Sequence, residues 1–275
     1  MNKERNNPED IANELLNGNG FTVLPQVFQK KEIEEARGLV LHYSENEKSK
    51  ETHFHGANND KLSLQKRVWN LLNKGDIFIR MVENPTLNGI VAKFLGEDFH
   101  IGSIAANRIM AGGPGQEPHI DYPYWDMYNE NSFPMGINYT VPMNCQTVIM
   151  LDDFTIENGG TAIVAHSQKK NSYPKEKEFF EKMQQITGKA GDVAIFYGMC
   201  WHCAMPNKSP YDRSAILIQY LPKFVIPMED QKKGVSEDVL NKSSDQLKKL
   251  LGFHYPYPKL MDHEVGVNRI GRNTE

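Results

Sequence analysis

Cysteine is scarce in this chain, and long apolar runs and blocks of positive charge are missing from it. Three cysteines in 275 residues cannot form a disulfide framework, which favours a reducing, cytoplasmic location. No apolar run reaches the ~18 residues of a membrane span, and the polar residues 1–10 lead us to expect no secretory signal. A formal net charge of −4 without a Lys/Arg block argues against a nucleic-acid partner. We therefore expect a small-molecule partner and no membrane or nucleic acid, with the oligomeric state left open.

The composition is that of an ordinary globular protein. With 39% hydrophobic and 24% charged residues, it excludes collagen-like, wholly disordered and coiled-coil classes. We find no repeat or linker and predict one domain over residues 1–275. Helical spacing of apolar residues predicts helices towards both ends, with Ser236 as the N-cap of the last one. These helices are expected at 30–43, 86–95 and 236–251, and residues 62–81 are expected to be helical in part.

A β core of about residues 99–225 is predicted by short apolar runs separated by clusters of Gly, Pro, Asn and Asp. A helix-like insertion at 175–186 interrupts this pattern. The predicted fold class is therefore mainly β, a sandwich or barrel, with the helices packed outside it. The expected strands are 21–24, before the core, and then 101–110, 147–151, 161–164, 192–197 and 214–221.

The candidate chemistry lies in two segments of this core. On a strand, His119 and Asp121 would project to the same face, although a single His-x-Asp often arises by chance. His202 follows the run 192–197, and Arg213 stands eleven residues later at the start of an apolar run. A buried arginine needs an anionic partner, which is either a ligand or a structural carboxylate. Two histidines and one carboxylate suit a facial triad that holds Fe(II) and leaves positions open, whereas zinc sites are more often closed or hydrolytic.

Four segments together resemble the phytanoyl-CoA dioxygenase family of Fe(II)/2-oxoglutarate-dependent oxygenases, including its ectoine-hydroxylase-like members. They occur in the order found in the family and cover about residues 20–221. The segments are NGFTVLPQVFQKKEIEEAR, PHIDYPYW, ENGGTAIVAHSQKK and GDVAIFYGMCWHCAMPNKSPYDRSAILIQY.

The resemblance implies a double-stranded β-helix, the jelly-roll or cupin-like fold, and a catalytic Fe(II) held by His119, Asp121 and His202. It implies that Arg213 binds the far carboxylate of the cosubstrate 2-oxoglutarate in a forked ion pair. Further cosubstrate contacts are expected from Asn107, Gln146 and Thr161.

The implied reaction uses O₂ to hydroxylate an unactivated C–H bond of a small, polar metabolite, and it releases succinate and CO₂. Halogenases of this superfamily replace the carboxylate ligand by a small residue, so Asp121 argues for hydroxylation, with desaturation and ring formation left open. The alternatives are a non-catalytic jelly-roll binding protein and a metal-dependent hydrolase that uses the same ligands.

Several other residues have two interpretations. Tyr122 and Trp125 follow the first two ligands and are expected either to line the substrate pocket or to pack in the core. The polar segment 45–64, which carries His53 and His55, is expected to be a lid that offers substrate contacts or a plain solvent loop. Three further residues are interpreted as structural: His166 as a loop residue, and Cys200 and Cys203 as small buried residues.

Overall fold

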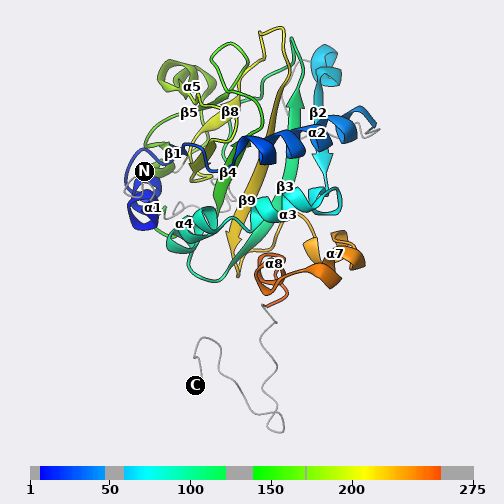
Figure 1. The fold of residues 1–275 in the computed structure, drawn as a ribbon. Coiled ribbons are helices and arrows are strands. Elements are labelled where there is room, and N and C mark those ends of the chain that lie inside the picture. Colours follow the sequence, from blue (N-terminus) through cyan, green and yellow to red (C-terminus); the bar gives the residue numbers. More distant parts are fainter. Residues whose placement is uncertain (1–6, 47–58, 122–138, 171, 255–275) are drawn as a thin grey trace.

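Two antiparallel sheets form the centre of the molecule (Figure 1). The computed structural model describes residues 7–46, 59–121, 139–170 and 172–254. The large sheet has six strands in the order β1-β7-β4-β9-β3-β2, and the small sheet has three in the order β6-β5-β8. Buried side chains of both sheets and of the helices belong to one hydrophobic core cluster.

Six of the nine strands match the predicted apolar runs closely, whereas β2, β6 and β8 were not predicted. The large sheet contains β1 (Phe21–Leu24), β2 (Gln65–Trp69), β3 (Phe99–Ile109), β4 (Cys145–Met150), β7 (Val193–Phe196) and β9 (Arg213–Pro222). The small sheet contains β5 (Thr161–Ile163), β6 (Gln184–Gln185) and β8 (His202–Ala204).

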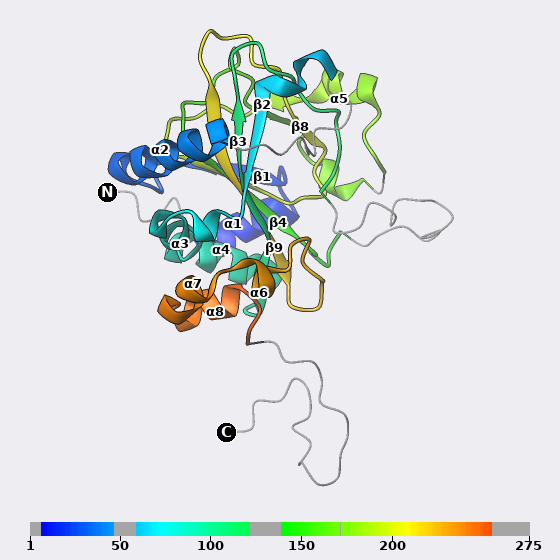
Figure 2. The same ribbon diagram turned by 90° about the vertical axis from the view of Figure 1, so that its right-hand side faces the viewer.

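Helices cover the large sheet on the side away from the small one. Figure 2 shows α2 and α3 on one side of the large sheet, and β8 and α5 on the other. Helices α2 and α4 contact β3, α1 packs on α4, and α8 contacts β3. No helix among the described residues is long and apolar enough to span a membrane. The helices are α1 (Pro8–Leu16), α2 (Lys30–Asn46), α3 (Asp76–Val82), α4 (Pro85–Leu95), α5 (Glu176–Lys182), α6 (Gln231–Gly234), α7 (Glu237–Lys242) and α8 (Asp245–Leu250), with 3₁₀ turns η1 (Asn59–Leu64), η2 (Leu71–Asn73) and η4 (Ser167–Lys169).

Local signals explain several helix ends. Gly96 ends α4 with a positive φ of 95°, which glycine adopts without steric cost. Ser236 accepts a hydrogen bond from Val239 N at the start of α7, so its predicted capping role is confirmed. The single helix predicted for 236–251 is wrong, because Ser244 caps a second helix, α8, after a break at Ser243.

The region 62–81 was expected to be partly helical, and it also contains a strand. Residues 65–69 form β2 at the edge of the large sheet, where Arg67 pairs with Asn107 of β3. Together with β1, this strand brings the N-terminal part of the chain into the sheet, so the β core is not confined to residues 99–225. The consequence for function is that β2 contributes side chains to the central cavity.

Candidate active site

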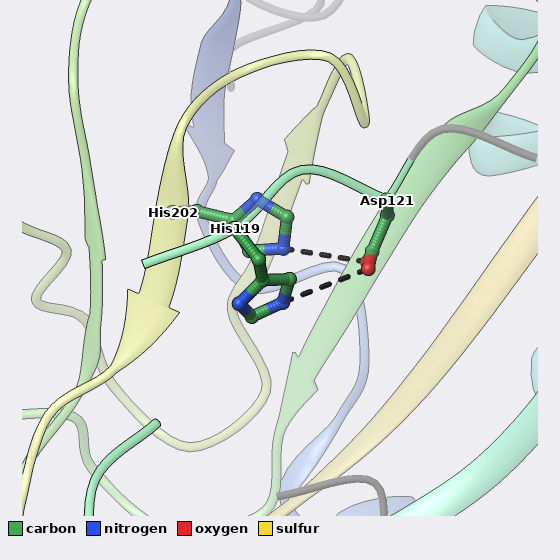
Figure 3. A group of neighbouring side chains, drawn as sticks. All are labelled: His119, Asp121 and His202. Carbon is green, nitrogen blue, oxygen red and sulfur yellow. Dashed lines mark ion pairs between the residues drawn. The ribbon is translucent and has the colours of Figure 1, made fainter. Parts of the chain in front are cut away.

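Two backbone hydrogen bonds bring His119 and His202 together. His119 N donates to His202 O at 2.9 Å, and His202 N donates to His119 O at 3.0 Å, as an isolated antiparallel bridge. His119 therefore lies in a short bridge and not in the longer strand that the sequence suggested. Ile120 is buried in the core, so the flanking His119 and Asp121 project together on its other side (Figure 3).

The three side chains converge on one point, as Figure 3 shows. Asp121 Oδ1 lies 3.6 Å from His119 Nε2, and Asp121 Oδ2 lies 3.3 Å from His202 Nε2. One potential ligand atom from each residue lies within 4.8 Å of the others, which makes this a candidate metal site. The backbone of Asp121 is held in place by its N–H, which donates to Gly198 O at 2.8 Å, and by Asn144 Nδ2, which donates to its carbonyl.

Backbone carbonyls set the orientation of both imidazole rings. His119 Nδ1 lies 2.7 Å from Glu117 O, and His202 Nδ1 lies 2.8 Å from Cys200 O. Because a carbonyl can only accept, each Nδ1 carries a proton that it donates to the carbonyl, and each Nε2 faces Asp121. This is the arrangement in which a histidine presents Nε2 to a metal ion, with its other nitrogen fixed by an outer hydrogen bond.

Asp121 is held in its charged form. Burial alone would raise the pKa of this carboxyl, but His202, His119 and Arg67 stabilise the carboxylate and lower its pKa to about 2. The site therefore offers one anionic oxygen ligand and two imidazole nitrogen ligands.

A cavity of about 370 Å³ opens from the triad and is lined by both sheets. Cavities of this size accommodate small-molecule ligands. The large sheet lines it with alternate residues, such as Ala215, Leu217 and Gln219 of β9, and the small sheet with Thr161 and His202.

Arg213 lies in this cavity and is 3% exposed. Its guanidinium lies 4.7 Å from the centre of the Phe154 ring, and its Nε and Nη2 are buried without a hydrogen-bond partner in the described part of the chain. Burial lowers the pKa of Arg213 to about 10, opposed by Asp152. The Asp152 carboxylate accepts hydrogen bonds from Arg37 and Ser214 N, so the structural salt bridge considered for Arg213 is absent among the described residues.

The other predicted cosubstrate residues also line the cavity, at different distances along the strands from Arg213 and the triad. Asn107 pairs with Ala215 two positions from Arg213, and it accepts a hydrogen bond of 3.1 Å from Gln65 Nε2. Thr161 pairs with Ala204, two residues beyond His202 on β8. Gln146 pairs with Phe196, whose ring centre lies 4.8 Å from that of His202, so it stands at the level of the triad.

The predicted substrate residues Tyr122, Trp125, His53 and His55 lie outside the described residues, as does most of the predicted lid 45–64. The two alternative interpretations of these residues therefore stay predictions.

The three residues interpreted as structural, His166, Cys200 and Cys203, lie outside the candidate metal site. His166 lies in a loop with φ 62°, where its Nδ1 is 2.9 Å from Gly18 O, and it is not part of the candidate metal site. Cys200 and Cys203 are buried free cysteines, and burial raises the pKa of both thiols to about 12.

Arg67 is a cavity residue that the sequence analysis missed. It lies 4.7 Å from the centre of the Trp69 ring, and its buried Nε has no hydrogen-bond partner among the described residues. Burial lowers the pKa of Arg67 to about 10, against the attraction of Asp121 and Glu229. The available signal was the alternation of polar and aromatic residues in Gln65-x-Arg67-x-Trp69, which fits the period of a strand with a polar inner face.

Two sheets with a two-histidine, one-carboxylate triad between them are the arrangement of the non-heme Fe(II) oxygenases. The chain belongs to the phytanoyl-CoA dioxygenase (PhyH) family, whose model matches residues 16–215. The predicted family is thereby confirmed, while the narrower likeness to ectoine-hydroxylase-like members stays a prediction.

Curated relatives include two fungal dioxygenases. Dioxygenase sphC of Aspergillus fumigatus is 27% identical over 216 residues, which are 75% of this chain and 55% of the relative. Dioxygenase ALT11 of Alternaria alternata is 25% identical over 219 residues, which are 75% of this chain and 67% of the relative. The chain thus spans little more than half the length of sphC.

Among solved structures, the chain resembles the non-heme alpha ketoglutarate dependent epimerase SnoN from nogalamycin biosynthesis. The TM-score is 0.58 at 16% identity, covering 80% of this chain and 86% of SnoN. This likeness and the two antiparallel sheets confirm the predicted mainly-β jelly-roll fold with flanking helices.

Proposed function

We propose that this protein is an Fe(II)- and 2-oxoglutarate-dependent dioxygenase that hydroxylates an unactivated C–H bond of a small, polar metabolite, with residues 1–275 working as one domain. One observation carries the proposal: the His119, Asp121 and His202 triad shares a cavity with Arg213, a buried cation whose Nε and Nη2 have no hydrogen-bond partner among the described residues.

The donor set fits Fe(II). Two imidazole nitrogens and one carboxylate oxygen converge from one side, and such a facial set leaves the opposite positions for cosubstrate and O₂. His119, Asp121 and His202 would hold the metal. The bound Fe(II) with 2-oxoglutarate would supply oxidative decarboxylation, which yields succinate and CO₂ and transfers one oxygen atom to the substrate.

The cavity also fits 2-oxoglutarate. Arg213 would bind the distal carboxylate bidentately, since guanidinium and carboxylate match in geometry and charge. Asn107 lies towards that end and Thr161 lines the same cavity, whereas Gln146 stands at the level of the triad and would contact the metal-binding end of the cosubstrate. Arg67 would add a second positive charge to the same space.

The protein contributes position and a low-water environment. The Nδ1 hydrogen bonds orient His119 and His202 so that each Nε2 faces the metal position, and the charged Asp121 supplies the single negative ligand. SnoN, a protein of similar fold, has been crystallised with Fe3+, alpha ketoglutarate and nogalamycin RO. That complex supports the proposal that this fold holds metal, cosubstrate and substrate together.

The decisive experiment measures succinate released from 2-oxoglutarate by protein purified without oxygen and loaded with Fe(II), Zn(II) or no metal. We expect release with Fe(II) and O₂ only, stimulated by the correct substrate. Hydrolysis of a candidate substrate by the Zn(II)-loaded protein would instead support the alternative of a metal-dependent hydrolase. Binding of 2-oxoglutarate without any turnover, across a broad metabolite collection, would identify the non-catalytic binding protein.

A further inference from the structure

Gln219 on β9 lines the cavity and is 4% exposed, yet its side-chain oxygen makes no hydrogen bond to any described residue. A buried polar group without a partner costs about 1–3 kcal/mol, so native proteins retain few of them. The alternation of β9 places Gln219 on the same face as Leu217, Ala215 and Arg213, which all line the cavity. The unpaired amide therefore belongs to the cavity wall.

Its position is at the triad end of the cavity and away from Arg213. Gln219 pairs with Ser103 on β3 and with Gln146 on β4, and Gln146 pairs in turn with Phe196, which contacts His202. Ser103, Gln219 and Gln146 thus form a polar row of neutral side chains across three neighbouring strands. Arg213 opens β9, six residues before Gln219. A short dicarboxylate bound to Arg213 would therefore leave the Gln219 amide free to bind another ligand.

The local backbone is shaped to admit this amide. The pairing of β3 with β9 shifts in register between Ile101 and Ser103, at Gly102. A Cβ atom at Gly102 would lie 2.5 Å from Gln219 Oε1 and 2.6 Å from Leu221 Cδ1, so glycine at this position lets both side chains lie against β3 in their present positions. The bulge and the glycine together hold a neutral hydrogen-bonding group in the cavity wall.

Large apolar side chains also line the cavity. Met228, in the segment after β9, is 50% exposed, and Tyr173, before α5, is 37% exposed. Both line the cavity, as does Trp69 at the end of β2. Exposed large apolar residues in a cavity wall are suited to be covered by the apolar part of a ligand.

We propose that Gln219 is a specificity-determining residue that binds a neutral hydroxyl or carboxamide group of the substrate, whose apolar framework packs against Trp69, Tyr173 and Met228. This inference rests on the proposed function, because it takes the Arg213 end to be occupied by 2-oxoglutarate. A hydroxyl or carboxamide both donates and accepts, as the Gln219 amide does, whereas a charged group would gain no ion pair from it.

The test is calorimetric titration of protein loaded with Mn(II) and 2-oxoglutarate with benzyl alcohol, benzamide, benzylamine and toluene. In the unaltered protein, we expect benzyl alcohol and benzamide to bind roughly tenfold more tightly than toluene, the value of one buried neutral hydrogen bond. Gln219→Leu should abolish this ratio, and Gln219→Glu should shift the preference to the cationic benzylamine. Gln185→Leu, on β6 outside the cavity lining, is the matched control and should keep the original ratio.

Ratios within each variant are insensitive to a general loss of stability, and the melting temperature of each variant reports its folding. If Gln219→Leu keeps the original ratio, or if the unaltered protein binds the four compounds equally or not at all, the assignment of Gln219 is wrong. Failure of 2-oxoglutarate itself to bind the Mn(II)-loaded protein would instead overturn the proposed function, and the compound ratios would still be measured on that protein.

Discussion

Asp121 contributes the negative charge of the metal site, since the other two ligands are histidines. Its carboxylate lies between the two Nε2 atoms, at 3.6 and 3.3 Å. Asp121→Ala should lower the affinity for Fe(II) or Mn(II) by more than ~100-fold, because losing even an outer-shell partner of a metal ligand costs about 10–100-fold. Calorimetric titration with Mn(II) measures this directly. Asp153→Ala, which removes a surface carboxylate paired with Lys189, is the control and should bind Mn(II) normally.

A substitution at Arg213 tests whether this residue binds 2-oxoglutarate. Arg213→Lys keeps the charge but loses the planar fork, so the KM for 2-oxoglutarate should rise roughly tenfold, within the ~1.5–3 kcal/mol of a charge-assisted hydrogen bond. The substrate-stimulated kcat should change less than the KM does. Arg80→Lys, in an exposed ion pair with Glu35, provides the comparison. An unchanged KM in Arg213→Lys would show that Arg213 has only a structural role.

The site role of a single residue could be predicted where its spacing or its sequence context indicates which way its side chain points. His119 and Asp121 stand two residues apart, and His202 and Arg213 flank short apolar strands; with the family resemblance, this spacing predicted four residues that the structure places in one cavity. Arg67 could not be found in this way, because its importance depends on the pairing of β2 with β3, a contact over about forty residues of sequence. Gln219 was missed because an unsatisfied amide is a property of packing and leaves no local pattern.

At the scale of elements, His100 connects β3 to the segment that follows β9. His100 Nε2 lies 2.9 Å from Val225 O, and Val225 precedes Met228, which lines the cavity. Burial lowers the pKa of His100, the Val225 carbonyl opposes this, and Lys232 adds to the lowering. Below pH 6.5, His100 therefore binds a proton more readily in the unfolded chain than in the folded protein.

The free energy of unfolding should accordingly fall as the pH drops below 6.5, since the unfolded state then binds more protons at this position. His100→Gln retains a hydrogen-bond donor and removes the titration, so its unfolding free energy should fall less over the same range. Urea denaturation on both sides of pH 6.5 provides the measurement, and His42→Gln, which removes an exposed histidine of α2, is the control. An equal fall in the unaltered protein and in His100→Gln would contradict this account.

Elements with a strong local signal were predictable, and those decided by long-range contacts were not. Six strands came from apolar runs bounded by turn residues, and α4 came from helical spacing ended by Gly96. The strand β2 carries no apolar run, because its cavity-facing residues are Arg67 and Trp69 and only Val68 is a buried aliphatic residue. The break between α7 and α8 depends on Ser244 capping, which competes with a continuous helix that the apolar spacing also permits.

At the scale of the whole molecule, the proposed site draws on both sheets. His202 lies on β8 of the small sheet, and Arg213 lies on β9 of the large sheet. A metal ion on the triad together with 2-oxoglutarate on Arg213 would therefore connect the two sheets through the cavity. Ligands that bind only the folded state raise its stability by mass action, by about 2.7 kcal/mol at a hundredfold excess over Kd.

Scanning calorimetry should then show that Mn(II) and 2-oxoglutarate stabilise the fold together more than the sum of each alone. Without metal, the negative Asp121 faces one end of the dianion, so 2-oxoglutarate alone should bind weakly; with Mn(II) this charge is neutralised. At a hundredfold excess over Kd, the cosubstrate should raise the Tm by roughly 5–10 °C in the presence of Mn(II), from about 2–4 °C per kcal/mol. Arg213→Lys should keep the increment from Mn(II) and lose most of the increment from 2-oxoglutarate. Strictly additive shifts, or equal shifts in Arg213→Lys, would mean that the two ligands do not share this cavity.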